Sequence, residues 1–182
     1  MCDPDRLLGE LRIEEAARER SRRRWLRQSS EENSTFVGVL VDLAEGRTPV
    51  ALATEAGEVR GRLNEVGADY CIVDDGRVEL VCRLLAVKSV LADTRAGRTA
   101  VAPAGDRHVR ADRTLHDLLA VWMDERPEIS ATVGARVRHR GALAWVGTDL
   151  FALHVSSSGG RVVHVPLSAL IYVHIERSAP LR

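Results

Sequence analysis

The segment Val59–Asp69, with the sequence VRGRLNEVGAD, returns 80 residues later as His139–Asp149, with the sequence HRGALAWVGTD. Six of the eleven aligned positions are identical. The identical pairs are Arg60 and Arg140, Gly61 and Gly141, Leu63 and Leu143, Val66 and Val146, Gly67 and Gly147, and Asp69 and Asp149. Self-similarity at a fixed spacing is typical of a duplicated structural unit.

The similarity continues on both sides of this segment. Upstream, Thr35-Phe36 corresponds to Thr114-Leu115. Downstream, Leu84-x-Ala86-Val87-x-x-Val90 corresponds to Leu167-x-Ala169-Leu170-x-x-Val173. The sequence therefore predicts two copies of one unit, at residues 34–91 and 113–176, joined by a linker at residues 92–112.

Each copy is expected to form a short helix followed by five strands. Thr35 (or Ser34) and Thr114 are residue types that cap helix N-termini, and each precedes apolar residues at helical spacing. Short apolar runs separated by glycine- and aspartate-containing turns then indicate antiparallel strands. The expected strands are Val50–Ala53, Glu58–Val66, Tyr70–Val73, Val78–Val81 and Leu84–Leu91 in the first copy, and Ile129–Val133, Val137–Val146, Leu150–Val155, Val162–Val165 and Ala169–Ile175 in the second.

The second strand of each copy is long and carries a central glycine, Gly61 or Gly141. Glycine permits the sharp bend by which one strand serves both sheets of a small barrel. The predicted fold is mainly β with α: two tandem five-stranded small β-barrels, each preceded by a short helix. A charged N-terminal helix at residues 1–33 precedes them, and residues 177–182 form a tail.

The order of a helix, a bent glycine-bearing strand, a Val-Gly-x-Asp turn and the segment Pro166–Val173 resembles Sm-like small β-barrels. Other SH3-like barrels share much of this pattern, and a tandem of this form is similar to proteins of high-GC bacteria. The resemblance implies RNA binding, and ring assembly by pairing the fourth strand of one barrel with the fifth strand of the next. The RNA pocket of that family needs an Asn after the aspartate and an Arg-Gly before the last strand. Tyr70 and Leu150 follow the aspartates here, and Leu84 and Leu167 stand where the glycine would be, so the pocket does not carry over.

The N-terminal segment contains a basic run, Arg18–Arg27, with six arginines and one glutamate. One interpretation is a basic arm that contacts phosphates or an acidic partner. The alternative is a solvated helix face on which neighbouring glutamates pair with the arginines. The arginines concerned are Arg18, Arg20, Arg22, Arg23, Arg24 and Arg27.

A second set of arginines lies on the long strands. Alternation places Arg60 and Arg62 on one face of their strand, and Arg138 and Arg140 on the corresponding face of theirs. This duplicated stripe is a candidate surface for RNA, DNA or an acidic protein. The alternative is an ordinary solvated strand face.

No residue set indicates catalysis or a cofactor. His154, His164 and His174 recur every ten residues, but no third ligand in register supports a metal site. Asp69 and Asp149 are expected to cap their own turns. Cys71 and Cys82 lie in apolar runs and are expected to be reduced and buried. We therefore expect no enzymatic activity, no metal and no cofactor.

Charge and composition narrow the function class. The chain has 26 basic and 26 acidic residues, so any nucleic-acid contact has to be local. No apolar stretch is long enough for a membrane helix and no secretory signal is present, which indicates a cytoplasmic protein. The leading hypothesis is a binding or assembly module that engages a protein partner or itself through exposed strand edges and the N-terminal helix. The alternative is an RNA- or DNA-binding regulator that uses the arginines.

Overall fold

The computed structural model describes residues 34–92, 113–155 and 160–175, together with seven separate residues between 15 and 32. Those seven are helical and exposed: Glu15, Arg18, Glu19, Ser21, Arg22, Trp25 and Glu32. The rest of the predicted N-terminal helix and the C-terminal tail lie outside the described residues, as does the predicted linker except Ala92, which ends a strand.

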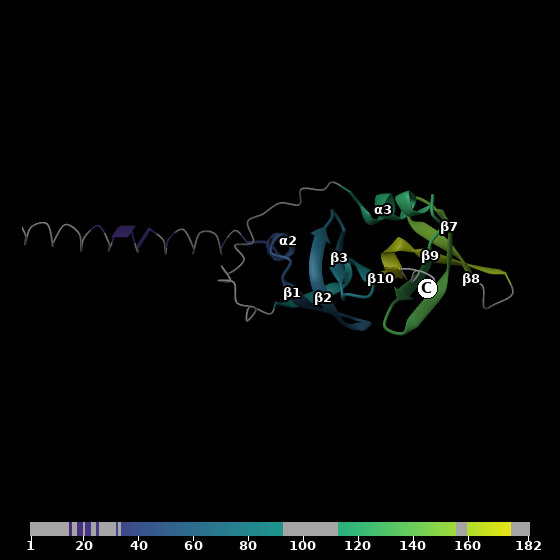
Figure 1. The fold of residues 1–182 in the computed structure, drawn as a ribbon, viewed down its shortest axis with the longest axis horizontal. Helices are drawn as coiled ribbons and strands as arrows, with labels where there is room; N and C mark the ends of the chain where they lie inside the picture. Colours follow the sequence, from purple (N-terminus) through teal and green to yellow (C-terminus); the bar gives the residue numbers. More distant parts are fainter. Residues whose placement is uncertain are drawn as a thin grey trace, which may run out of the picture.

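Both halves of the chain run through one helix and five strands in the same order, as predicted, but Leu84–Ala86, expected to begin the last strand of the first copy, forms a 3-10 turn. The first half consists of α2 (Phe36–Glu45), β1 (Pro49–Thr54), β2 (Gly57–Val66), β3 (Tyr70–Asp74), β4 (Glu79–Arg83), the 3-10 turn η1 (Leu84–Ala86) and β5 (Val87–Ala92). The second half consists of α3 (Leu115–Trp122), β6 (Glu128–Val133), β7 (Val137–Val146), β8 (Leu150–Val155), β9 (Arg161–Pro166), the 3-10 turn η3 (Leu167–Ala169) and β10 (Leu170–Ile175). The described part of the molecule is thus mainly β with two short helices, and Figure 1 shows the two halves side by side.

The two helices begin at the residues expected from sequence. Thr35 Oγ1 accepts a hydrogen bond from the backbone N–H of Gly38, at 3.0 Å. Thr114 forms a capping box with Asp117, in which each side chain accepts from the backbone of the other residue. These contacts satisfy backbone donors that have no partner within the helix, so each helix starts directly after its threonine.

The ten strands form one antiparallel sheet in the order β5-β1-β2-β3-β4-β10-β6-β7-β8-β9. Each half keeps the same internal order, since β10 takes the place in the second half that β5 takes in the first. The halves are joined where β4 pairs with β10, with Tyr172 opposite Cys82 and His174 opposite Leu80. We call this junction the seam. The ladders therefore form one open, continuous sheet across both copies.

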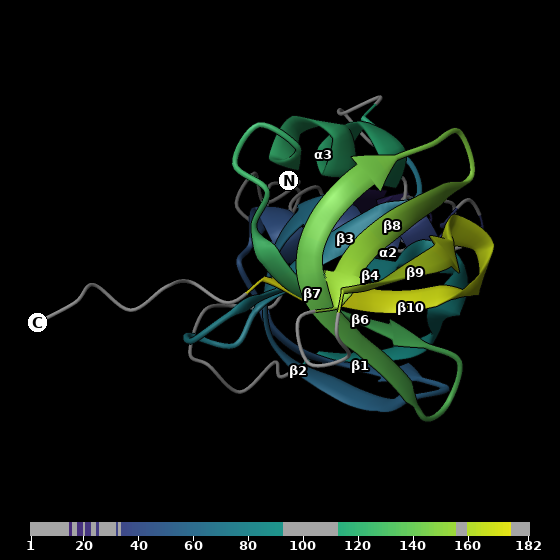
Figure 2. The same ribbon diagram turned by 90° about the vertical axis from the view of Figure 1, so that its right-hand side faces the viewer.

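The central glycines of the long strands lie in close contact with the neighbouring strand. A Cβ atom on Gly61 would collide with the carbonyl oxygen of Asp74, and one on Gly141 would collide with that of His154. Both strands also shift register two residues further on, between Leu63 and Glu65 in the first half and at the corresponding place in the second. Figure 2 shows β7 as a strongly curved ribbon across the second half. Glycine is required here because the neighbouring strand folds back too closely for a side chain.

Two hydrophobic cores lie on either side of the seam, and each contains residues from the other half. Tyr70 and Val81 come from the first half but are buried in the core of the second half. Tyr172 comes from the second half and packs against the core of the first. This exchange makes the two copies mutually dependent, since neither can bury its apolar residues fully alone.

Candidate interaction surfaces at the sheet edges

At the seam the two copies of the repeat contact each other through a pair of antiparallel strands. Strand β4 offers its outer edge, and β10 adds to it through four opposed residue pairs from Glu79 to Cys82. Beyond the ladder, Arg83 Nη1 donates to the carbonyl oxygen of Ser168 at 2.8 Å. Backbone ladders of this kind satisfy the polar groups that an edge strand otherwise exposes.

The β2–β3 turn of the first half also contacts helix α3. The backbone N–H of Ala68 donates to the carbonyl oxygen of Arg113 at 2.9 Å. The backbone N–H of Leu115 donates to Asp69 Oδ1 at 2.6 Å. Asp69 was expected to cap its own turn; its side chain instead accepts from the first residue of a helix in the other copy. A carboxylate is favourable at this position because helix N-termini carry partial positive charge.

Tyr70 connects the turn to the core of the second half. Its hydroxyl donates to Glu65 Oε1 at 2.6 Å, while its ring is fully buried. Burial raises the pKa of Tyr70 well above its ordinary value of 10.0, and the hydrogen bond with Glu65 and the charge of Glu65 raise it further. Arg113 opposes these effects. The side chain therefore stays neutral at physiological pH, with its ring in the core of the second half and its hydroxyl hydrogen-bonded to Glu65.

Within the described sheet, β5 and β9 are the two outermost strands, and each pairs on one side alone. On β5, Lys88, Ser89 and Leu91 are exposed, and Leu91 is 73% exposed. On β9, Arg161, Val162, His164 and Pro166 are exposed. These edges correspond by topology to β10 and β4, the two strands that meet at the seam.

Apolar side chains gather near both outer edges. Trp145, on β7, is 42% exposed. The centroid of its ring lies 5.6 Å from that of His164 on β9. Near β5, Leu85 is 75% exposed. Exposed tryptophan and leucine beside unpaired strand edges are typical of interaction surfaces.

The predicted arginine stripes lie where expected, but acidic neighbours balance part of their charge. Arg60 Nε contacts Glu58 at 2.5 Å, and Arg140 Nε contacts Glu128 at 3.0 Å. Arg62 donates to the carbonyl oxygen of Arg47 at 3.5 Å. Arg138 is exposed on β7. Of the basic run, Arg18 and Arg22 are exposed on helical residues, whereas Arg20, Arg23, Arg24 and Arg27 lie outside the described residues.

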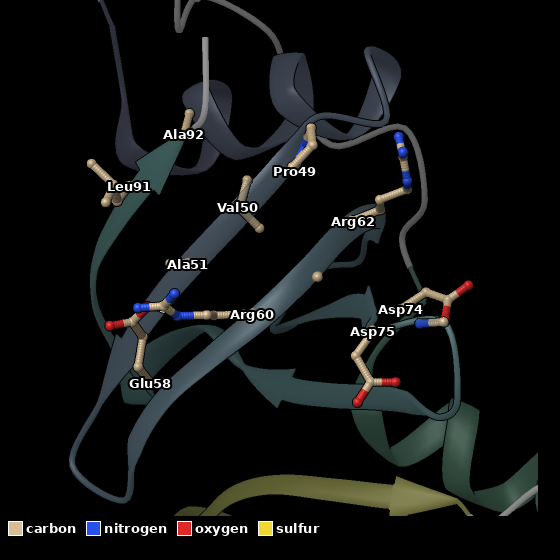
Figure 3. A pocket seen from close by; sticks show the side chains of 12 residues that line it. Pro49, Val50, Ala51, Glu58, Arg60, Arg62, Asp74, Asp75, Leu91 and Ala92 are labelled. Carbon is tan, nitrogen blue, oxygen red and sulfur yellow. Dashed lines mark hydrogen bonds and ion pairs between the residues drawn. The ribbon is translucent and has the colours of Figure 1, made fainter. Parts of the chain in front are cut away.

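Sequence reasoning missed a groove of about 900 Å³ on the first half. It runs from the β5 edge across β1 and β2 to the β3–β4 turn, and Arg60 and Arg62 are among its lining residues (Figure 3). The acidic residues Glu58, Asp74 and Asp75 face the same space, so the groove is mixed in charge. On β1 the groove is lined by Pro49, Val50 and Ala51, of which Pro49 and Ala51 are the less buried.

The candidate metal and redox residues do not assemble into a site. His154 and His164 lie diagonally across β8 and β9. His174 lies on β10, which β6 and β7 separate from β8 in the sheet. No cluster of three metal-ligating residues occurs in the described ranges. Cys71 and Cys82 oppose each other and are buried free thiols, as predicted. Their hydrogen bond, together with burial, holds the pKa of the Cys82 thiol above its ordinary range, which disfavours a reactive thiolate.

None of the helices among residues that the structure describes has the length and hydropathy to cross a membrane. No protein-family model matches the chain, and no curated protein matches its sequence.

Proposed function

We propose that this protein is a non-enzymatic binding and assembly module of the cytoplasm, and that its two outer edges, β5 and β9, take up strands from a protein partner. Each half is in this view a small Sm-like or SH3-like barrel built from one helix and five strands. The charged N-terminal helix predicted from the sequence is, in this proposal, a further contact for the same partner. No catalytic residue has a role in this function.

The observation that supports the proposal is the seam. At the seam the two copies of the repeat are joined by pairing of β4 with β10. These two strands correspond to β9 and β5, the outer edges of the sheet. Strand addition gives affinity through main-chain hydrogen bonds, and specificity through the side chains that alternate along the strand. Because β4 and β10 pair in this way, we expect the corresponding strands β9 and β5 to be able to pair with a strand of a partner.

The two edges also carry features that restrict unselective pairing. Pro166 ends β9 and has no backbone N–H to donate. Lys88, the one lysine in the chain, lies on β5 and pairs with Glu55 at 3.1 Å. Lysine and proline on edge strands are the usual means by which proteins avoid aggregation. Together with exposed Leu91 and Trp145, they favour a selected partner over open-ended stacking.

The competing nucleic-acid function has less support among the described arginines. Arg60 and Arg140, the identical pair of the repeat, each contact a glutamate on the same sheet. An arginine that already pairs with a carboxylate neutralises a phosphate less effectively.

The proposal is tested with charged substitutions at the edges of the full-length protein. Leu91→Lys and Val162→Lys place a charge where a partner strand would pack, and each is expected to weaken partner binding by at least tenfold. The controls are Val121→Lys and Val137→Lys, since these exposed valines lie on α3 and at the start of an inner strand.

Binding is measured with hydrogen exchange of the complex and quantitative pull-down from the source cytosol. Amides of β5 or β9 should gain protection when the partner binds. A partner whose binding is unchanged by both edge variants would contradict the proposal. A shift of labelled RNA or DNA at low salt that is lost in Arg22→Ala would favour the alternative function.

A further inference from the structure

We infer that the outer face of the second half binds a helix of a partner protein, and that the first turn of this helix contacts Trp145, Asp149 and Leu150. We call these three residues, which flank the β7–β8 turn, the turn site. The turn site belongs to a sheet face and receives a helix through side chains. It is therefore distinct from the strand edges of the proposed function and does not require strand pairing.

The first half shows what this face of the fold receives. Tyr70 lies in the core of the second half together with Leu115, the first residue of α3. The backbone N–H of Leu115 donates to Asp69 Oδ1 at 2.6 Å, and that of Ala68 donates to the carbonyl oxygen of Arg113 at 2.9 Å. The β2–β3 turn and the face beside it thus hold the N-terminal turn of a helix that begins with leucine.

An aromatic ring lies over the corresponding turn in both halves. A Cβ atom on Gly67 would collide with the ring of Tyr70, and one on Gly147 would touch the ring of Trp145 at 3.0 Å. Tyr70 follows its turn, whereas Trp145 precedes its turn. The ring is therefore present at the same place in space in the second half, although a different strand supplies it.

The carboxylate of the contact is present as well. Asp149 occupies the position of Asp69 and is exposed. Trp145 is 42% exposed, whereas Tyr70 is fully buried. A carboxylate favours the N-terminal end of a helix, because that end carries partial positive charge. The second half thus has the ring and the acceptor of the helix contact, both open to solvent.

The exposed copy of the face carries fewer charges than the covered copy. Figure 2 looks onto its strands, β7, β8 and β9. Three carboxylates of the first half are replaced in the second by an indole, an imidazole and an aliphatic group: Glu65, Asp74 and Glu79 correspond to Trp145, His154 and Val162. Faces in contact with water ordinarily carry more charge than covered ones, so this replacement favours a partner that covers the face.

The size of the site favours a helix of another protein over one from a second copy of this chain. A second copy would offer Phe36 of α2, the counterpart of Leu115. In the second half, Leu150 stands at the position of Tyr70 while the ring of Trp145 already lies over the turn. Two large side chains therefore occupy a region that Tyr70 serves alone, and an aliphatic residue fits beside them with less overpacking than a phenyl ring.

A helical peptide tests the turn site in the full-length protein. The probe is a synthetic peptide with the sequence Arg113–Trp122, extended at its C-terminus by two EAAAK repeats that favour a helix and by a fluorophore. The α3 of the protein itself occupies the face of the first half, so the peptide is expected to bind the turn site of the second half. Fluorescence anisotropy should show saturable binding of one peptide per chain.

Matched variants locate the bound peptide. Trp145→Ala should weaken binding about tenfold, as is usual for a central tryptophan of an interface. Asp149→Ala should weaken it about fivefold, the loss that corresponds to one helix cap, and this exposed position keeps the test valid if Trp145→Ala fails to fold. The control is Val137→Ala, which alters another exposed side chain of β7 and should leave binding unchanged. A peptide with Leu115→Asp should not bind.

Absence of saturable binding up to about 1 mM peptide, or binding that neither Trp145→Ala nor Asp149→Ala weakens, overturns the turn site. Sedimentation velocity tests the occupant. Self-association of the chain that is lost in both Trp145→Ala and Phe36→Ala would make a second copy the occupant and overturn the assignment to another protein.

The same peptide separates the turn site from the proposed edge function. Leu91→Lys, on the edge strand of the first half, should leave peptide binding unchanged. If the peptide does not bind but Leu91→Lys still abolishes binding of a strand partner, the turn site alone falls. If the peptide binds as expected but no partner depends on the edges, the edge function alone falls.

Discussion

Strands β4 and β9 occupy the same place in the repeated fold, but their surroundings differ. β4 is covered by β10, and the turn beside it holds helix α3 through Asp69. β9 is the outermost strand of the described sheet, and Asp149 and Trp145 beside it are exposed. The comparison teaches that the same strand of a repeated unit can be an internal joint in one copy and an outer edge of the sheet in the other, with different side chains around it.

The largest expected difference between the two edges is in the free energy of unfolding that is lost when Tyr70 or its counterpart Leu150 is replaced by alanine. Tyr70→Ala removes a fully buried ring from the core of the other half, and should lower the free energy of unfolding by about 3–5 kcal/mol. Leu150 is half-buried, so Leu150→Ala should cost clearly less. Urea denaturation of both variants at low protein concentration measures the difference. Equal losses would contradict the assignment of Tyr70 to the second core.

The next largest difference in stability is expected between the first residues of the two helices, Leu115 and Phe36. Leu115→Ala should lower the free energy of unfolding by about 2–5 kcal/mol, because Leu115 is fully buried at the seam. Phe36→Ala should cost the dilute monomer less than half as much, because a large part of its ring already contacts water. Thermal and urea unfolding of matched variants provide the test. A Phe36 variant as unstable as the Leu115 variant would mean that α2 is packed as tightly as α3.

A smaller difference is expected between the two turn aspartates. Asp69→Ala removes the acceptor for the Leu115 N–H and should cost about 1 kcal/mol, the usual value for a lost helix cap. Asp149→Ala should change the stability of the monomer by less than about 0.5 kcal/mol, as is usual for exposed residues. Chemical denaturation at equal protein concentration distinguishes them. If both substitutions cost the same, Asp69 has no special role in the seam.

The smallest expected change in stability at neutral pH comes from the ionisation of Tyr70, which affects the free energy of unfolding only at alkaline pH. Its pKa is raised in the folded protein, so the native state holds this proton more tightly than the unfolded chain does. The stability contributed by this group is therefore fully present below pH 10, and declines above pH 10 as the unfolded tyrosine ionises. Unfolding measured between pH 9 and pH 11 should show this decline in the wild type and a weaker decline in Tyr70→Phe. An identical pH dependence in the two proteins would disprove the assignment of this decline to Tyr70.

Features that depend on neighbours in sequence were predictable. Thr35 and Thr114 were expected to start the helices, and both do. Gly61 and Gly141 were expected to permit bends, and both lie where a side chain would collide with backbone. Such features rely on residue type and short spacing, so a single chain carries the information for them.

Features that depend on the meeting of the two copies were not predictable. Asp69 and Leu115 are 46 residues apart, and Arg83 and Ser168 are 85 apart. No periodicity connects residues at such distances. The burial of Tyr70 in the opposite core also had no signal in its own strand, since a tyrosine after a turn is equally common on a surface.

The sequence by itself determined that the chain holds two copies of a unit of one helix and five strands, because caps, glycines and apolar alternation act within a few residues. Only the tertiary structure decided which edges meet. That choice depends on how two curved sheets fit together and on which apolar side chains are buried when they do. As a result β4 became an internal joint, and β5 and β9 became the outer edges of the sheet.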